Sequence, residues 1–137
     1  MGPFDGWLGV STFDDPDEKR TRQGIRSARG ALADPGRFEK LTKWHGDKAR
    51  WVLDAWTDVW LSTEFVGWSL DEHLGSIRCP VLAIHGDRDE YGSLEFPRRI
   101  FHGVAGPAEM VILEGVGHVP HRERPEDVLE LIYRFPG

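Results

Sequence analysis

Two apolar segments in the second half of the chain each end in a glycine that is followed within a few residues by a polar side chain. The first, IRCPVLAIHGD, leads to Asp87 and Asp89, and the second, AEMVILEGVGH, leads to His118. A continuous apolar run rich in β-branched residues predicts a strand that is buried on both faces, as in a parallel sheet. Because functional groups gather at the carboxyl ends of parallel strands, we expect the acid and the histidine to meet at one edge of the sheet.

Helical segments follow both strands and also occupy most of the first half of the chain. SLEFPRRIFHGV and PEDVLELIYRF carry a proline near their starts, which suits the first turn of a helix. The order strand–helix–strand–helix predicts an α/β fold with a parallel sheet. Upstream, we expect a strand at Trp7–Phe13 and helices over residues 17–32, 37–45 and 47–61. The last of these helices presents an apolar stripe made of Val52, Ala55, Trp56, Val59 and Trp60.

Composition narrows the class of protein. A chain of 137 residues makes one domain at most, and its net charge of −6 argues against a nucleic-acid partner. No apolar stretch reaches the roughly 18–20 residues that a membrane-spanning helix needs, and no signal peptide is visible. Cys79 is the single cysteine, so no internal disulfide can form. We therefore expect a cytoplasmic protein with neither a nucleic-acid nor a membrane partner.

The acid and the histidine suit general base chemistry. A carboxylate that accepts the Nδ1 proton of a histidine fixes the tautomer of the ring and makes Nε2 a general base. Asp87 and Asp89 both stand where this carboxylate is needed; the alternative for Asp89 is an aspartate that only caps its turn, and Asp87 is more typical of a turn residue that accepts amide hydrogen bonds. A divalent metal site is a further alternative, although the spacing of its five possible ligands matches no metal motif: His85, Asp87, Asp89, His118 and His121.

From about Leu74 to Phe135 the chain resembles the C-terminal part of an α/β-hydrolase. CPVLAIHGDRDEYG is similar to the seventh strand and the acid turn of that family, in which the acid stands third after the glycine, here Asp89. GVGHVPHRERPE resembles the histidine loop and places His118 in the catalytic position. The resemblance implies one partial domain over residues 1–137, with a short parallel sheet and flanking helices. Residues from about 15 to 72 would form a helical cap, residues 74–137 the core, and Trp7–Phe13 strand six.

The resemblance also implies an activity, namely hydrolysis of esters or related acyl compounds with apolar groups, without a metal or an organic cofactor. The family places its nucleophile on a G-x-S-x-G elbow, and this motif is absent from the sequence. The closest string, GVSTF, makes Ser11 a candidate nucleophile. The tryptophans of the helical segment either fill the core of the cap or line a pocket for the substrate. Four side chains are candidates for contact with the substrate: Tyr91, Trp56, Trp60 and His121.

The implied strand order leaves one edge of the sheet open. In the family, strand five pairs with strand six, and no segment of this sequence corresponds to strand five. An unpaired apolar edge invites pairing with another chain. We therefore expect a homodimer, a higher oligomer, or a complex with a separate N-terminal half. The alternative function, from a different class, is a non-catalytic remnant or interaction module that pairs through this edge.

Overall fold

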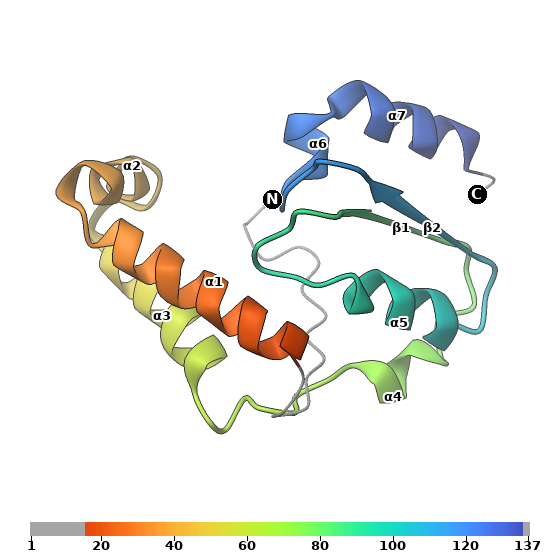
Figure 1. The fold of residues 1–137 in the computed structure, drawn as a ribbon, viewed down its shortest axis with the longest axis horizontal. Helices are drawn as coiled ribbons and strands as arrows, with labels where there is room; N and C mark the ends of the chain where they lie inside the picture. The colour runs from red at the N-terminus through yellow and green to blue at the C-terminus, as the bar shows by residue number, and fades with distance from the viewer. Residues whose placement is uncertain (1–15, 136–137) are drawn as a thin grey trace.

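The computed structural model describes residues 16–135 and arranges them as three long helices beside a small α/β unit (Figure 1). Ser11 and the strand expected at Trp7–Phe13 lie outside the described residues. The described part contains a parallel two-stranded sheet with flanking helices, so the predicted fold class is confirmed. In chain order the elements are α1 (Pro16–Leu32), α2 (Pro35–His45), the 3-10 turn η1 (Gly46–Lys48), α3 (Ala49–Leu61), α4 (Asp71–Leu74), β1 (Val81–Gly86), α5 (Glu95–Gly103), β2 (Ala108–Leu113), α6 (Pro120–Glu123) and α7 (Pro125–Arg134).

The boundaries of α2 follow from local capping. The side chain of Asp34 accepts a hydrogen bond from the amide of Arg37 at 3.1 Å, and Pro35 occupies the first turn, so the helix begins two residues earlier than predicted. Gly46 ends it with a φ of +59°, a left-handed conformation that glycine adopts without strain. The helix predicted over residues 47–61 begins at Ala49, because η1 takes up the residues before it.

Helices α1, α2 and α3 form a three-helix unit in which α3 packs against both α1 and α2. The face of α3 that is buried carries Ala49, Leu53 and Thr57, which lie four residues apart, and the hydroxyl of Thr57 donates to the carbonyl oxygen of Leu53 at 3.0 Å. The predicted apolar stripe is therefore not the buried face: its members are partly buried, and Val59 is 47% exposed. The buried face of α3 therefore carries no tryptophan.

The tryptophans of this region do not form a common core. Trp44 and Trp51 are 82% and 70% exposed, and Trp68 is 39% exposed. Trp56 and Trp60 are partly buried. The interpretation that tryptophans fill the core of this region is thus wrong for Trp44, Trp51 and Trp68.

Strands β1 and β2 run parallel, with Val81 opposite Ala108 and Gly86 opposite Leu113. Helix α5 packs against both strands, and α7 lies on the other side of the sheet (Figure 1). A strand buried on both faces was predicted for β1, but Gly86 is its only fully buried residue. The prediction is wrong within residues 16–135, because one helix on each side is too little to cover two apolar strands completely.

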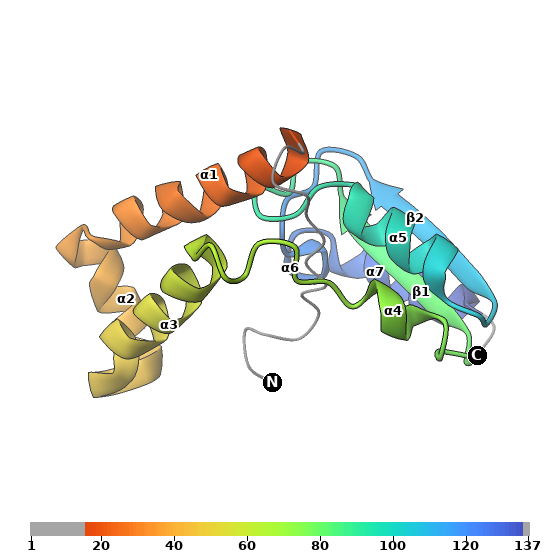
Figure 2. The ribbon, with the colours of Figure 1, turned by 90° about the horizontal axis from the view of Figure 1, so that it is seen from below.

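The three-helix unit contacts the sheet at the carboxyl ends of the strands (Figure 2). A Cβ atom on Gly24 of α1 would lie 2.1 Å from the carbonyl oxygen of Glu90, so α1 approaches the loop after β1 as closely as a glycine permits. Arg22 of α1 donates hydrogen bonds to the carbonyl oxygens of Trp60 and Leu61. These bonds hold the last turn of α3 against α1. None of the helices in residues 16–135 is both long and apolar enough to cross a membrane.

Candidate active site

The first loop of the candidate site is the acid turn, residues 87–92, which follows β1. The amide of Asp89 donates to the carbonyl oxygen of Gly86 at 3.3 Å. Its carboxylate Oδ1 accepts the amide of Tyr91 at 2.8 Å and the amide of Gly92 at 3.1 Å. An aspartate that bonds to amides two and three residues further on stabilises a tight turn. Asp89 therefore caps its own turn, and it does so while only 5% exposed.

The second loop is the histidine loop, residues 114–118, which follows β2. Gly115 has a φ of +73°, where a side chain would be strained, and its amide donates to Oδ1 of Asp87 at 2.7 Å. The amide of Gly117 donates to Oε2 of Glu123 at 3.0 Å. Asp87 thus accepts an amide hydrogen bond as predicted, and the bond joins the two loops. Asp87 and Glu123 together fix the backbone on both sides of the segment that leads to His118.

Gly86 permits the two loops to touch. A Cβ atom at this position would lie 2.2 Å from the carbonyl oxygen of Val116 and 2.4 Å from that of Gly117. The amide of Arg88 donates to the carbonyl oxygen of Val116 at 2.9 Å, and Val116 itself is 2% exposed. The histidine loop therefore packs directly on the backbone at the end of β1, which is possible because Gly86 has no side chain.

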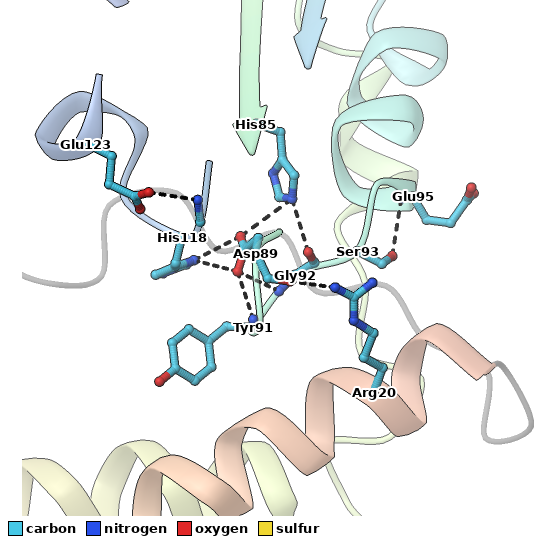
Figure 3. Close-up of polar contacts among 10 residues, drawn as sticks. Arg20, His85, Asp89, Tyr91, Gly92, Ser93, Glu95, His118 and Glu123 are labelled. Carbon is cyan, nitrogen blue, oxygen red and sulfur yellow. Dashed lines mark hydrogen bonds and ion pairs between the residues drawn. The ribbon is translucent and has the colours of Figure 1, made fainter. Parts of the chain in front are cut away.

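This packing brings the two principal residues together. Nδ1 of His118 lies 2.9 Å from Oδ2 and 3.0 Å from Oδ1 of Asp89 (Figure 3). An ionised carboxylate only accepts hydrogen bonds, so Nδ1 of His118 carries the proton and Nε2 is the basic nitrogen of the ring. The expectation that the acid and the histidine meet at the same edge of the sheet is met by the geometry.

Several groups act on the pKa of Asp89. Burial raises it, but the hydrogen bond from His118, the amide of Tyr91 and the charges of His118 and His85 outweigh burial, so the pKa lies below its ordinary value. The carboxylate is therefore ionised at neutral pH. Burial raises the pKa of the Tyr91 hydroxyl, and the nearby carboxylates of Glu90 and Asp89 add to the effect. Tyr91 therefore keeps its proton at neutral pH.

A residue that the sequence did not single out for this role also reaches Asp89. His85, the next-to-last residue of β1, places Nε2 3.1 Å from the carbonyl oxygen of Gly92 and 3.5 Å from Oδ2 of Asp89 (Figure 3). The sequence signal for it was weak. His85 stands just before the glycine of the strand-end pattern, but its partner is a backbone oxygen seven residues further along.

The candidates for substrate contact separate into two groups. Tyr91 lies between Trp56 and His118, making edge-to-face contacts with ring centroids 5.7 Å and 5.1 Å apart, respectively. Trp60 lies one helical turn beyond Trp56 and contacts Phe65 instead, with centroids 4.9 Å apart. His121 is exposed on α6, which agrees with a position at the surface.

An open groove of about 430 Å³ runs along α1 and reaches Tyr91. Small residues of α1, including Gly24, Ala28 and Ala31, form part of its wall, and Arg20 and Gln23 add polar groups. The groove gives an extended molecule room beside the aromatic ring that contacts His118.

The alternative of a metal site finds no geometric support. Within residues 16–135 no three His, Cys, Asp or Glu side chains are grouped so that they could hold a metal ion. Asp87 is bound to the amide of Gly115, and His121 is exposed on α6. Of the five ligands considered from the sequence, His85, Asp89 and His118 meet, but they contact one another or the backbone, and Asp87 and His121 do not join them.

Comparison with solved structures gives the same fold. The chain resembles a membrane phospholipase A described as a bacterial virulence factor, with a TM-score of 0.62 and 20% identity over 93% of this chain and 46% of that chain. It resembles a serine hydrolase involved in carbazole degradation, with a TM-score of 0.59 and 18% identity over 93% of this chain and 50% of that chain. An α/β-hydrolase from a Medee basin deep-sea metagenome library gives a TM-score of 0.54 and 14% identity over 94% of this chain and 53% of that chain.

The chain therefore spans about half the length of the structures that it matches. No curated protein matches it in sequence. The model of the Alpha/beta hydrolase family matches residues 2–131, which is nearly the whole chain. Together with the acid turn and the histidine loop at the carboxyl ends of two parallel strands, this match shows that the chain belongs to the α/β-hydrolase family.

Proposed function

We propose that the chain supplies the acid and the base of a hydrolase that cleaves esters or related acyl compounds. The observation that carries the proposal is the contact of Nδ1 of His118 with both carboxylate oxygens of buried Asp89, at 2.9 Å and 3.0 Å. The hydrogen bond from Nδ1 to the carboxylate holds the ring in the tautomer that a general base requires. Membership of the α/β-hydrolase family supports the same reaction class.

In the proposed mechanism Nε2 of His118 carries one proton at a time between the reacting oxygens. Nε2 of His118 takes the proton from a nucleophilic hydroxyl as that oxygen attacks the acyl carbon. The same proton then passes to the departing alkoxide. In the second half of the reaction Nε2 takes a proton from the attacking water and returns it to the oxygen of the nucleophile as the acid is released. Asp89 stabilises the imidazolium that exists in between. Ser11, the candidate nucleophile of this chain, lies outside the described residues.

We further propose that the active form is an assembly, either of copies of this chain or with a second polypeptide that carries the other half of the fold. The matched structures are about twice as long as this chain. The residues of β1 before Gly86 are only partly buried, and β1 has only β2 as a strand neighbour within residues 16–135. Both observations are what a sheet that continues into another chain would give.

The substrate would approach under the three-helix unit, which we propose acts as a cap. The ring of Tyr91 contacts both His118 and Trp56, and Tyr91 is also one of the residues that line the groove along α1. The aromatic rings of Tyr91 and Trp56 favour an acyl or aryl group over a charged one. A cytoplasmic location is part of the proposal, because the exposed thiol of Cys79 stays reduced there.

The proposal is tested with a short-chain p-nitrophenyl ester and a fluorophosphonate probe, which labels an activated serine covalently. We expect turnover that falls by about 10³-fold in His118→Ala and in Asp89→Asn. Mass spectrometry of the labelled protein then identifies the nucleophile. Label on Ser11 that is lost in Ser11→Ala would assign it to this chain, and label on a copurifying polypeptide would assign it to a partner.

The matched control is His73→Ala, which removes an exposed imidazole of α4, outside both loops. We expect it to retain the activity of the wild type. Turnover that persists in His118→Ala would refute the proposed base. Absence of both turnover and labelling in every assembly state would favour the second candidate, an interaction module that binds through the outer edge of β1. That candidate is supported by the single strand neighbour of β1 within residues 16–135.

A further inference from the structure

Two histidines approach the carboxylate of Asp89, one from each loop-bearing strand end (Figure 3). His118 comes from the histidine loop after β2, and its role is that of the proposed base. His85 comes from β1 itself and is 15% exposed at its side chain. We propose that His85 is a positioning residue, which closes the acid turn so that both carboxylate oxygens of Asp89 face His118.

The hydrogen bond of His85 determines its tautomer. A carbonyl oxygen can only accept, so the contact of 3.1 Å with the carbonyl oxygen of Gly92 requires the proton on Nε2 of His85. His118 requires its proton on Nδ1, because its partner there is the ionised carboxylate of Asp89. The two rings at one carboxylate are therefore opposite tautomers, and each is set by a different acceptor.

The same bond joins Gly92, at the end of the acid turn, to His85 in β1, seven residues earlier in the sequence. His85 belongs to β1, and Gly92 is the last residue of the turn that bonds to the carboxylate of Asp89. The amide of Gly92 donates to Oδ1 of Asp89 at 3.1 Å while its carbonyl oxygen accepts from His85. One peptide segment is thus held by Asp89 on one side and by His85 on the other, and this fixes the carboxylate between them.

Close packing supports the same assignment. A Cβ atom on Gly92 would lie 3.2 Å from Oδ2 of Asp89 and 3.3 Å from Cε1 of His85, so the ring, the carboxylate and the backbone are in contact with little free space. At 3.5 Å, Nε2 of His85 is too far from Oδ2 for a full hydrogen bond. His85 consequently acts on Asp89 mainly through Gly92 and not as a second direct partner.

The catalytic consequence rests on the proposed function, but the positioning itself can be measured without turnover. The experiment is a ¹⁵N–¹H correlation of the imidazole rings in the 137-residue chain at neutral pH, together with hydrogen exchange of the amides of Tyr91 and Gly92. We expect the wild type to show His85 with its proton on Nε2 and His118 with its proton on Nδ1. In His85→Phe we expect His118 to become a mixture of tautomers and both amides to exchange about tenfold faster.

Two variants make the result specific. His85→Gln keeps a side-chain N–H for the carbonyl oxygen of Gly92, and we expect it to restore the tautomer of His118 and the slow exchange. His73→Phe replaces an exposed histidine and should change neither. The proposal is overturned if wild-type His85 carries its proton on Nδ1, or if His85→Phe leaves both the His118 tautomer and the exchange rates unchanged. If the tautomers are as expected but the protein has no esterase activity in any assembly, the proposed function fails and the positioning role of His85 stands.

Discussion

The two loops at the end of the sheet and the apolar faces of the helices are organised in different ways. In the acid turn and the histidine loop, backbone amides and carboxylates are joined by hydrogen bonds, and Asp89 and Val116 are almost fully buried. On α7, by contrast, Leu129 and Ile132 are 53% and 55% exposed although both are apolar. The two loops are held by internal hydrogen bonds, whereas part of the apolar surface of α7 is exposed.

The contrast teaches which properties this chain can hold by itself. Asp89 and His118 are joined by a hydrogen bond between residues 29 positions apart in the sequence, and Asp87 and Gly115 by one between residues 28 positions apart. Burial of β1 and α7 needs further layers of structure, and within residues 16–135 those layers are thin. We therefore expect substitutions between the loops to have large effects on the isolated chain, and substitutions on the exposed faces to have small ones.

The largest effect should come from Gly86→Ala. The added methyl group would lie 2.2 Å from the carbonyl oxygen of Val116, which is backbone and cannot move aside cheaply. We expect a loss of about 3 kcal/mol or more in the free energy of unfolding, measured by urea denaturation, together with separation of His118 from Asp89. The control is Gly75→Ala, where a Cβ atom meets nothing within 4 Å. Equal stability of the two variants would show that the loops are not packed as described.

The next effect concerns the contact between the three-helix unit and the acid turn. In Gly24→Ala the methyl group would lie 2.1 Å from the carbonyl oxygen of Glu90, so α1 must move away from the loop. We expect a loss of about 2 kcal/mol and a change in the near-ultraviolet circular dichroism of Trp56 and Tyr91, whose rings are in contact.

Gly30→Ala is the control on the same helix. Nothing lies within 4 Å of its added Cβ atom, and an alanine inside a helix is favoured over glycine by about 0.5–1 kcal/mol. The two substitutions are chemically identical and should change stability in opposite directions. A stabilising Gly24→Ala would mean that α1 does not touch the acid turn in solution.

The pH dependence of stability tests the charge of Asp89 at the site. Because the pKa of Asp89 is lower in the folded chain than its ordinary value of about 3.9, its contribution to stability is complete well above that pH. It is lost as the pH falls through the ordinary value and on toward the lower pKa of the folded state. We expect Asp89→Asn to cost about 1.5 kcal/mol at pH 7 and clearly less at pH 3, from urea denaturation at a series of pH values. A cost that does not depend on pH would show that the charge of Asp89 does not stabilise the fold.

How far the sequence predicts the molecule also differs between the two regions. The glycine-terminated strands and the residues after them predicted the meeting of Asp89 with His118, because strand ends are encoded by short local patterns. The sequence suggested His85 only as a possible metal ligand; its actual partner is the carbonyl oxygen of Gly92, and a backbone group has no signature in the sequence. The contact between acid and histidine was therefore predictable from the sequence, but the hydrogen bond of His85 beside it was not.

For α3, the hydrophobic pattern indicated the wrong face. The tryptophan-bearing stripe has the greater hydrophobicity, yet the buried residues are Ala49, Leu53 and Thr57. Thr57 can be fully buried because its hydroxyl bonds to the carbonyl oxygen one turn earlier. Close helix packing was the deciding property, and hydropathy alone does not measure it.

The smallest effect on stability should come from substitutions on the exposed face of α7, and the informative measurement there is self-association. Leu129 and Ile132 are both more than half exposed, so replacing both with lysine should change the free energy of unfolding by no more than about 0.5 kcal/mol per site. If this face contacts another chain, two buried charges would oppose the contact. We expect the wild type to sediment as a dimer or larger species at micromolar concentration and the double variant to dissociate at least tenfold more readily.

Glu130→Lys is the matched control, because it changes the net charge by the same amount on the same helix without touching the apolar face. Glu130 is exposed and pairs with Arg134, so losing that pair should matter little to stability. Dissociation in the double variant but not in Glu130→Lys would place the interface on the apolar side chains and not on the charge of α7. Equal dissociation in both would make the association electrostatic, and a wild-type chain that sediments as a monomer would show that the exposed face of α7 needs no partner chain.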